Sequence, residues 1–395
     1  MIFVATNLAN LLNLILSLTL ARVLGPEAFG WLSAFFAVQL FGFLLISGWQ
    51  NTLVVHLKEL SATERDQFAG WALSRVPSLA IALLFSVVVL TTLRGNGLVE
   101  TLKLPLLGVA LLLSLWLNYW LVHLRACDLF ANRNKRFAVN LILENGAKVA
   151  LILGGTLLTH DPISLAAICA ASQVIPYLSY LGGSKGVLAR TARPSFKLGR
   201  LFILLQGGFF AFFDSDLVIA ASLAAGEGTG KMAVLNLGAK IVFFAFTGLT
   251  IATIADQARL EPDVARRKLY ETARFLGIGT IVIVAGGALL PGLAFTFLSG
   301  DPTYASASEL TLILCTAALF TLNAFWMNAL CARERYEWIG PYLWIAALRS
   351  GAVIILFWIN GPLVAVLGLN LVMQALLSVL IFRGTRSGFR KHANA

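Results

Sequence analysis

Apolar runs, each near 20 residues long, follow one another along the whole chain. A helix needs about 20 such residues to cross the roughly 30 Å of hydrocarbon in a bilayer. The pattern therefore predicts an all-α integral membrane protein with about twelve transmembrane helices. The predicted spans are residues 3–21, 29–50, 70–93, 104–124, 137–158, 163–183, 200–225, 232–255, 271–298, 306–330, 339–360 and 362–382.

The connections between these spans alternate between basic segments and short segments rich in Gly, Pro and Asp. Because cytoplasmic loops of membrane proteins carry the excess of Lys and Arg, the alternation predicts that both termini are cytoplasmic. The basic connections are residues 58–67, 125–136, 184–199, 256–270 and 332–338, together with the tail after residue 383.

Composition supports a membrane protein. The chain is 58% hydrophobic and only 12% charged, whereas soluble domains carry about 25% charged residues. The net charge of +11 comes mostly from the cytoplasmic connections, so no nucleic-acid partner is needed. Membrane lipids are expected partners, and binding of anionic lipid headgroups by the basic connections is a less favoured reading than topology alone. The four cysteines and four histidines have no metal-ligand spacing, so no metal site is expected.

An internal repeat divides the chain into two halves. Residues 21–30 align without gaps with residues 221–230, a shift of 200 positions. The same shift places Lys148 at position 348, within one residue of Arg349. With six spans in each half, the halves are parallel repeats about a pseudo-twofold axis along the membrane normal. The predicted domains are an N-terminal lobe (1–183), a basic interlobe linker (184–199), a C-terminal lobe (200–383) and a basic tail (384–395).

Several charged residues fall inside the predicted spans, where each costs roughly 2.5–3.5 kcal/mol on insertion scales unless it faces a cavity or a partner. Glu144 and Lys148 are spaced (i, i+4) and can form an ion pair on one helix face. Asn140 continues the same stripe. The bases are Arg75, Lys148, Lys240 and Arg349, and the acids are Glu144, Asp214 and Asp216.

Asp214 and Asp216 are two residues apart, so they point to different helix faces and are expected to do different jobs. One of them can pair with Lys240 as a lock between the lobes. The small surplus of bases would suit an anion such as phosphate or pyrophosphate. This surplus of positive charge decides in favour of an anionic substrate only if a carboxylate is protonated when the substrate binds. Desolvation of the carboxylate favours that protonation.

Polar side chains also form stripes at helical spacing on several spans. Hydrogen bonds between helices explain any single stripe, but several stripes beside intramembrane bases favour a hydrated cavity between two lobes. The candidate cavity-lining residues are Asn10 and Asn13 on the first span, Asn140 on the fifth, Gln173 and Tyr177 on the sixth, and Asn236 on the eighth.

Three segments resemble a known family. The stretch Leu20–Gly30 looks like the first-hairpin signature of the bacterial polysaccharide-export and O-antigen flippases. Residues 216–220 and the turn after them resemble the family's seventh span. Residues 297–305 and 310–314 are similar to its connection between spans nine and ten. These flippases are the oligosaccharide branch of the multidrug/oligosaccharidyl-lipid/polysaccharide (MOP) exporter superfamily, which includes the MATE transporters.

The resemblance implies two six-helix bundles in the bacterial inner membrane that alternate access, without enzymatic activity or a cofactor. The implied substrate is an undecaprenyl-pyrophosphate-linked oligosaccharide, moved from the cytoplasmic to the periplasmic leaflet. A polysaccharide polymerase or ligase is the implied protein partner. In the expected cationic cavity, Lys148 and Arg349 hold the pyrophosphate, and Lys240 and Arg75 line its path. Glu144, Asp214 and Asp216 are the candidates for coupling to a proton or sodium gradient.

The alternatives remain open. A cation-coupled multidrug antiporter of the same superfamily would need a net acidic cavity. A lipid II flippase usually has additional spans, and a major facilitator would carry a basic Gly-Asp-Arg loop, which residues 58–69 lack. From a different class, a membrane-embedded polysaccharide polymerase or glycosyltransferase would need a large polar loop. The longest polar connection, residues 184–199, contains no carboxylate or histidine.

Overall fold

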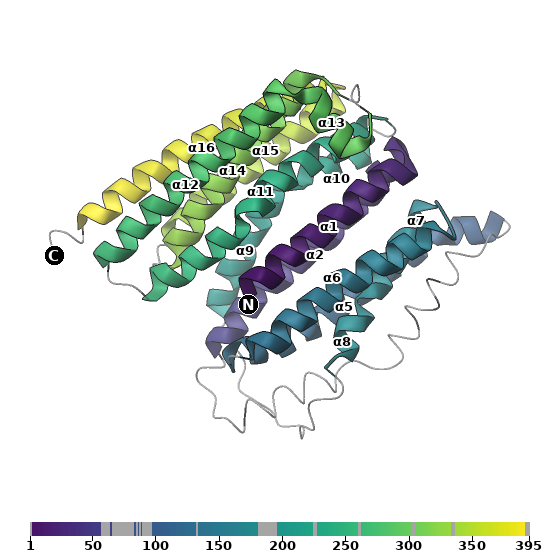
Figure 1. Ribbon diagram of the computed structural model, residues 1–395, viewed down its shortest axis with the longest axis horizontal. Coiled ribbons are helices and arrows are strands. Elements are labelled where there is room, and N and C mark those ends of the chain that lie inside the picture. Colours follow the sequence, from purple (N-terminus) through teal and green to yellow (C-terminus); the bar gives the residue numbers. More distant parts are fainter. Residues whose placement is uncertain are drawn as a thin grey trace. The chain divides into compact units, whose positions relative to one another are not determined.

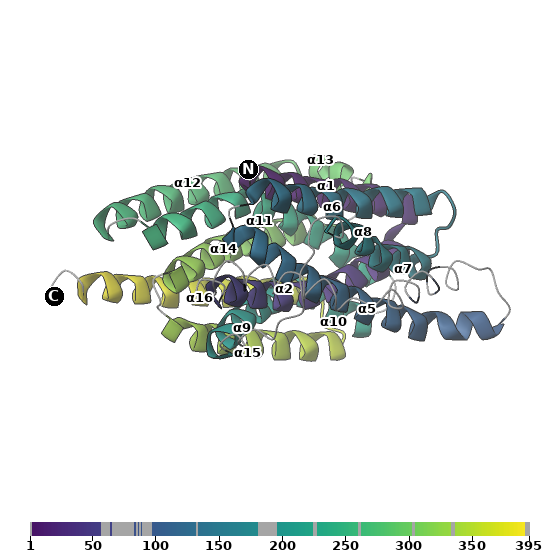
Figure 2. The same cartoon turned by 90° about the horizontal axis from the view of Figure 1, so that it is seen from below.

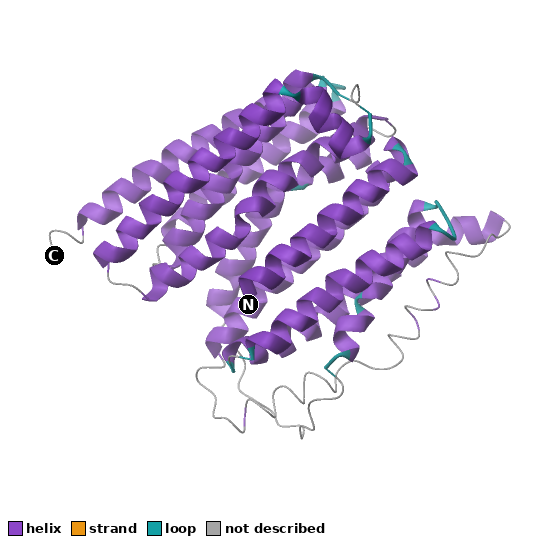
Figure 3. Ribbon diagram, viewed as in Figure 1, coloured by secondary structure: helices purple, strands orange, loops and turns teal. Residues whose placement is uncertain are grey.

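The computed structural model describes residues 2–56, 97–131, 133–180, 196–223, 227–259, 262–301, 305–332 and 336–391, together with residues 64, 83, 86 and 88. Within these ranges every regular element is a helix (Figure 3). The described part contains nine helices long and apolar enough to cross a membrane, or ten if one bent pair is a single span. The predicted all-α membrane fold is therefore confirmed.

Most of the predicted spans agree with these helices. Residues 70–93 lie outside the described residues except at three positions, and the span predicted at 271–298 is interrupted. The sixth span is the shorter apolar pair α7 (Pro162–Ser172) and α8 (Val174–Leu178). The seventh is the bent pair α9 (Phe196–Phe213) and α10 (Ser215–Leu223), which turns by 57°. The linker predicted at 184–199 lies outside the described residues as far as residue 195.

The chain forms two compact units. The first consists of Met1–Leu16 and Trp31–Gly207, and the second of Ser17–Gly30 and Gly208–Ala395. Helices α1 (Ile2–Leu24) and α2 (Pro26–His56) each contribute to both units. The boundary between units therefore cuts through the first two helices.

The first unit is completed by α5 (Gly97–Phe130), α6 (Asn134–Thr156), α7 and α8. Helices α5 and α6 contact each other, and both contact α7 and α8. The start of α7 is fixed by Asp161, whose carboxylate accepts hydrogen bonds from the backbone N–H groups of Ile163 and Ser164. Such an N-cap satisfies donors that the first helical turn leaves unpaired.

The second unit is organised around α14 (Ala307–Ala332), which contacts α11 (Glu227–Arg259), α12 (Pro262–Leu289) and α16 (Leu363–Lys391) (Figures 1 and 2). The unit also contains α13 (Pro291–Ser299), a short 3-10 helix (Tyr336–Trp338) and α15 (Ile339–Trp358). In their most apolar stretches, 67% of α11 and 61% of α14 are buried, against 11% of α12. Helices α11 and α14 therefore form the interior of this unit, and α12 covers them.

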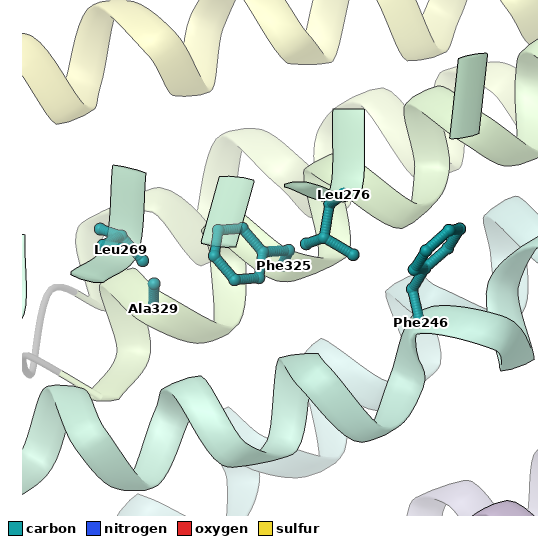
Figure 4. Close-up of a cluster of buried hydrophobic side chains, with 5 residues drawn as sticks. All are labelled: Phe246, Leu269, Leu276, Phe325 and Ala329. Atoms are coloured by element: carbon teal, nitrogen blue, oxygen red, sulfur yellow. The ribbon is translucent and has the colours of Figure 1, made fainter. Parts of the chain in front are cut away.

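A cluster of apolar side chains joins these three helices (Figure 4). Phe246 comes from α11, Leu269 and Leu276 from α12, and Phe325 and Ala329 from α14. Leu276 is fully buried, and Phe325 is 1% exposed. Since lipid is as apolar as these side chains, the close packing itself holds the helices together.

The tip of the first hairpin is built into the second unit. Gly25 ends α1 with a φ of 75°, a conformation that glycine adopts without strain. Arg22 donates from Nη2 to the carbonyl oxygen of Phe297 at 2.7 Å. A Cβ atom on Gly30 would lie 2.7 Å from the backbone nitrogen of Gly230. The two glycines matched by the internal repeat are thus in direct backbone contact.

Some helix boundaries differ from the prediction. Helix α5 continues to Phe130, through the first part of the connection expected at 125–136. Helix α11 runs to Arg259 and α12 begins at Pro262, so most of the connection expected at 256–270 is helical. The span expected at 271–298 is interrupted between α12 and α13, because Pro291 cannot donate the backbone hydrogen bond that would continue α12.

Candidate functional site

The charged stripe on α6 belongs to a buried network with α5. Arg125 donates from Nη2 to Glu144 Oε2 at 2.6 Å and from Nε to Asn140 Oδ1 at 2.8 Å. Arg125 is 7% exposed and Glu144 is 8% exposed. The ion pair of Glu144 with Lys148 that the (i, i+4) spacing allows is not the pair that Glu144 forms. The partner is Arg125, which the sequence had placed in a cytoplasmic connection.

Asn140 fixes the position of this pair. Its Nδ2 donates to the carbonyl oxygen of Pro176 at 2.7 Å and to Ser179 Oγ at 2.8 Å. Its Oδ1 accepts from Arg125. Asn140 is 2% exposed, and at such a site an unpaired amide would cost about 1–3 kcal/mol. The amide therefore ties α5 and α6 to the end of α8.

One turn closer to the start of α6, a second pair continues the same stripe. Tyr180 donates its hydroxyl hydrogen to Asp128 Oδ2 at 2.8 Å. Arg136 Nε lies 3.7 Å from the same carboxylate oxygen, and its guanidinium carbon lies 4.6 Å from the centre of the Tyr180 ring. The face of α6 formed by residues 136, 140, 144 and 148 is therefore polar at every turn.

Lys148 differs from the other buried or half-buried cations of the described spans. Its neighbours one turn away on α6, Glu144 and Ile152, are buried, whereas Leu143 and Leu151 are exposed on another face. Lys148 therefore lies on the inward face of α6, where it is half-buried. Within the described residues it has neither an ion pair nor a hydrogen bond.

The remaining buried or half-buried Lys and Arg side chains of the described residues all have carboxylate partners. The pairs are Arg125–Glu144, Arg136–Asp128, Lys231–Glu309, Lys240–Asp214 and Arg349–Asp216. The charge of Lys148 is therefore not compensated by the part of the chain that the structure describes.

The second unit contains an equally buried cluster around Arg349 of α15. Its guanidinium forms an ion pair with Asp216 and donates to the carbonyl oxygen of Ala211, to Ser215 Oγ at 2.7 Å and to Asn370 Oδ1 at 2.8 Å. Asn370 in turn donates to Asp216. Arg349 is fully buried, so a substrate anion could reach it only if this cluster rearranged.

Asp214 lies between α9 and α10, where the pair bends. Its Oδ1 accepts from Asn236 Nδ2 at 2.8 Å and lies 2.9 Å from Lys240 Nζ. Asp214 and Asp216 point to different neighbours, as their two-residue spacing predicts, because Asp214 contacts α11 whereas Asp216 contacts α15 and α16. The predicted pairing with Lys240 is also confirmed, but it lies within the second unit and is no lock between lobes.

The other predicted polar residues have mixed surroundings. Asn13 donates to Asn145 Oδ1 at 2.7 Å and so joins α1 to α6. Asn10 Nδ2 and Gln173 Oε1 are buried without a hydrogen-bond partner among the described residues. Tyr177 packs in an apolar cluster with Leu121 and Leu124. Arg75 lies outside the described residues.

Sequence reasoning missed Arg125, Asp128 and Asn145 as members of these networks. Arg125 and Asp128 directly follow the apolar run of the fourth span, so their charge suggested a loop. The available signal was the extension of the α6 stripe back to Arg136, which predicts partners on a neighbouring helix at that depth. No group of three or more His, Cys, Asp or Glu that could hold a metal occurs in the described ranges.

Comparison of the sequence with family models finds no match. A comparison with curated proteins finds none either.

Solved structures with the same fold are transporters. An inward-facing multidrug resistance MATE family transporter of the MOP superfamily matches with a TM-score of 0.70 and 14% identity, over 97% of this chain and 96% of that chain. The lipid II flippase MurJ, in an inward closed conformation, matches with a TM-score of 0.69 and 14% identity, over 98% and 87%. A MOP superfamily transporter from Pyrococcus furiosus, described as having a binding pocket of reverse polarity, has a TM-score of 0.59 and 15% identity, over 97% and 93%. The chain therefore has the fold of the MOP superfamily transporters.

Proposed function

We propose that this protein is a flippase that moves an undecaprenyl-pyrophosphate-linked oligosaccharide from the cytoplasmic to the periplasmic leaflet of the bacterial inner membrane. The ammonium group of Lys148 is the proposed contact for the pyrophosphate. The oligosaccharide would pass along the polar helix faces, while the prenyl chain stays in lipid.

The observation that carries this proposal is the uncompensated charge of Lys148 on the inward face of α6. A lysine near the middle of a span costs roughly 2.5–3.5 kcal/mol on insertion scales. Residues that are expensive inside a membrane usually mark a substrate or ion pathway. An anionic headgroup would supply the missing countercharge, and lysine binds phosphate as a point charge.

The carboxylates of the described spans argue against a cationic substrate. Glu144, Asp214 and Asp216 each have a basic partner within ion-pair distance. A cation-drug antiporter would have to break one of these buried pairs to offer a carboxylate to its substrate. Breaking such a pair by removing one partner typically costs about 3–5 kcal/mol. The charge distribution therefore favours an anionic substrate.

The test replaces Lys148 with alanine. Purified protein in detergent is titrated with undecaprenyl pyrophosphate and with uncharged undecaprenol as a second probe. Loss of one charge-assisted hydrogen bond, about 1.5–3 kcal/mol, should weaken pyrophosphate binding by roughly 10- to 150-fold. Binding of undecaprenol should not change. In a strain that lacks the gene, Lys148→Ala should fail to restore surface polysaccharide.

Lys135→Ala is the matched control, because Lys135 lies on the same helix but is exposed. It should bind undecaprenyl pyrophosphate like the unaltered protein and restore polysaccharide. If Lys148→Ala inserts normally, binds the pyrophosphate normally and restores polysaccharide, the proposal is wrong. If the unaltered protein, returned to the strain that lacks the gene, restored resistance to cationic drugs but not surface polysaccharide, the chain would belong to the antiporter class.

A further inference from the structure

Glu144 has two possible cationic partners. Lys148 lies four residues further along α6, and a Glu followed by a Lys at this spacing is the favourable order for a pair within one helix. Arg125 lies on the neighbouring helix, and it is Arg125 that Glu144 contacts, at 2.6 Å. The outcome of this competition decides whether the charge of Lys148 is neutralised within its own helix.

The geometry explains why Arg125 takes Glu144. The guanidinium presents several donors in a rigid, planar arrangement, whereas lysine carries its charge on a flexible chain. Nε of Arg125 is held by Asn140, so Nη2 points at Glu144. Asn140 is itself held from the other side by Pro176 and Ser179. The guanidinium of Arg125 is therefore already oriented toward Glu144, whereas no contact within the described residues orients the ammonium group of Lys148 toward it.

We propose that Arg125 is a positioning residue that holds Glu144 and thereby keeps the ammonium group of Lys148 free for the anionic headgroup of the substrate. This inference rests on the proposed function. Without Arg125, Glu144 turns to Lys148 and neutralises the anion site, although Lys148 itself is intact. A pair with purely structural importance would not have this effect on binding.

The experiment uses full-length purified variants and undecaprenyl pyrophosphate as the probe. Arg125→Gln should weaken binding by roughly 10-fold or more, because Glu144 then pairs with Lys148 and the charged contact between Lys148 and the pyrophosphate is lost. Adding Glu144→Gln to this variant removes the competing carboxylate. The double variant should return to within about threefold of the original affinity, since no new contact to the probe is lost.

Two further variants test whether weaker binding comes only from a general loss of structure. Arg125→Lys keeps a buried positive charge but loses the planar donors, so it should lose affinity several-fold and regain it when Glu144→Gln is added. Tyr180→Phe disturbs the neighbouring Asp128 cluster without touching Glu144 or the polar face of α6, so its binding should not change. Melting temperatures are measured for every variant.

Unchanged binding in both Arg125 variants would overturn the inference. A double variant that melts like the original protein but binds as weakly as Arg125→Gln would overturn it as well. Lys148→Ala separates this inference from the proposed function. If Lys148→Ala binds normally, the anion site and this inference both fail. If it binds weakly while the Arg125 variants bind normally, the positioning role alone fails.

Discussion

Replacing Gly30 with alanine should destabilise the second unit, because its added Cβ has no room. The ideal Cβ position lies 2.7 Å from the nitrogen of Gly230, 2.9 Å from its Cα and 2.9 Å from the carbonyl carbon of Thr229. These distances are about 0.5–0.7 Å below the 3.4 Å at which ordinary contact begins. All three atoms belong to backbone, so no side chain can rotate away, and either α2 or α11 must move.

Overpacking of this kind costs about 1–3 kcal/mol. Alanine also favours a helix over glycine by about 1 kcal/mol, which would partly hide the clash. Gly228→Ala measures this gain in helix propensity without a clash. Gly228 lies on the same α11 turn as Gly230, and its Cβ would meet nothing within 4 Å. The difference between the two variants isolates the cost of the clash.

The assay is thermal unfolding in detergent at one fixed scan rate, followed by circular dichroism, since membrane proteins often unfold irreversibly. Gly30→Ala should melt several degrees below Gly228→Ala, which should melt at or above the temperature of the unaltered protein. Equal melting temperatures for the two alanine variants would refute the close contact between the two glycines.

Two further predictions use the same assay. Arg349→Ala should lower stability by about 3–5 kcal/mol, because it leaves the buried Asp216 without its cation, and adding Asp216→Asn should recover part of the loss. An Arg349→Ala variant that melts normally would contradict this arrangement. Tyr180→Phe should cost about 1–3 kcal/mol, because Asp128 loses the hydroxyl that donates to it at 2.8 Å. A melting temperature unchanged by Tyr180→Phe would show that this hydrogen bond contributes nothing.

Length and hydropathy were sufficient to place most of the spans, because a bilayer demands long apolar helices wherever the chain crosses it. The same criterion misplaced Arg125 and Asp128. A charge at the edge of an apolar run normally marks the membrane surface, and only partners elsewhere in the chain reverse that inference. Those partners, Glu144 and Tyr180, lie 19 and 52 positions away in sequence.

Which acid pairs with which base could not be predicted from the local sequence pattern either. Glu144 with Lys148 was the favoured local pair, but a guanidinium oriented by Asn140 from another helix outcompetes it. The bend at Asp214 had a visible sign, a carboxylate in an apolar span, but its partners on α11 come from the tertiary packing. Sequence identifies which side chains need a partner, and the fold decides which partner they find.

The anchoring of the first hairpin in the second unit has a consequence for how the protein is made. Arg22 and its hydrogen-bond partner Phe297 are 275 positions apart. At about 5–20 residues per second, tens of seconds pass between the synthesis of these two residues. During that interval the hairpin tip already exists, but the surface that will hold it does not. The helices synthesised first are therefore among the last to complete their packing.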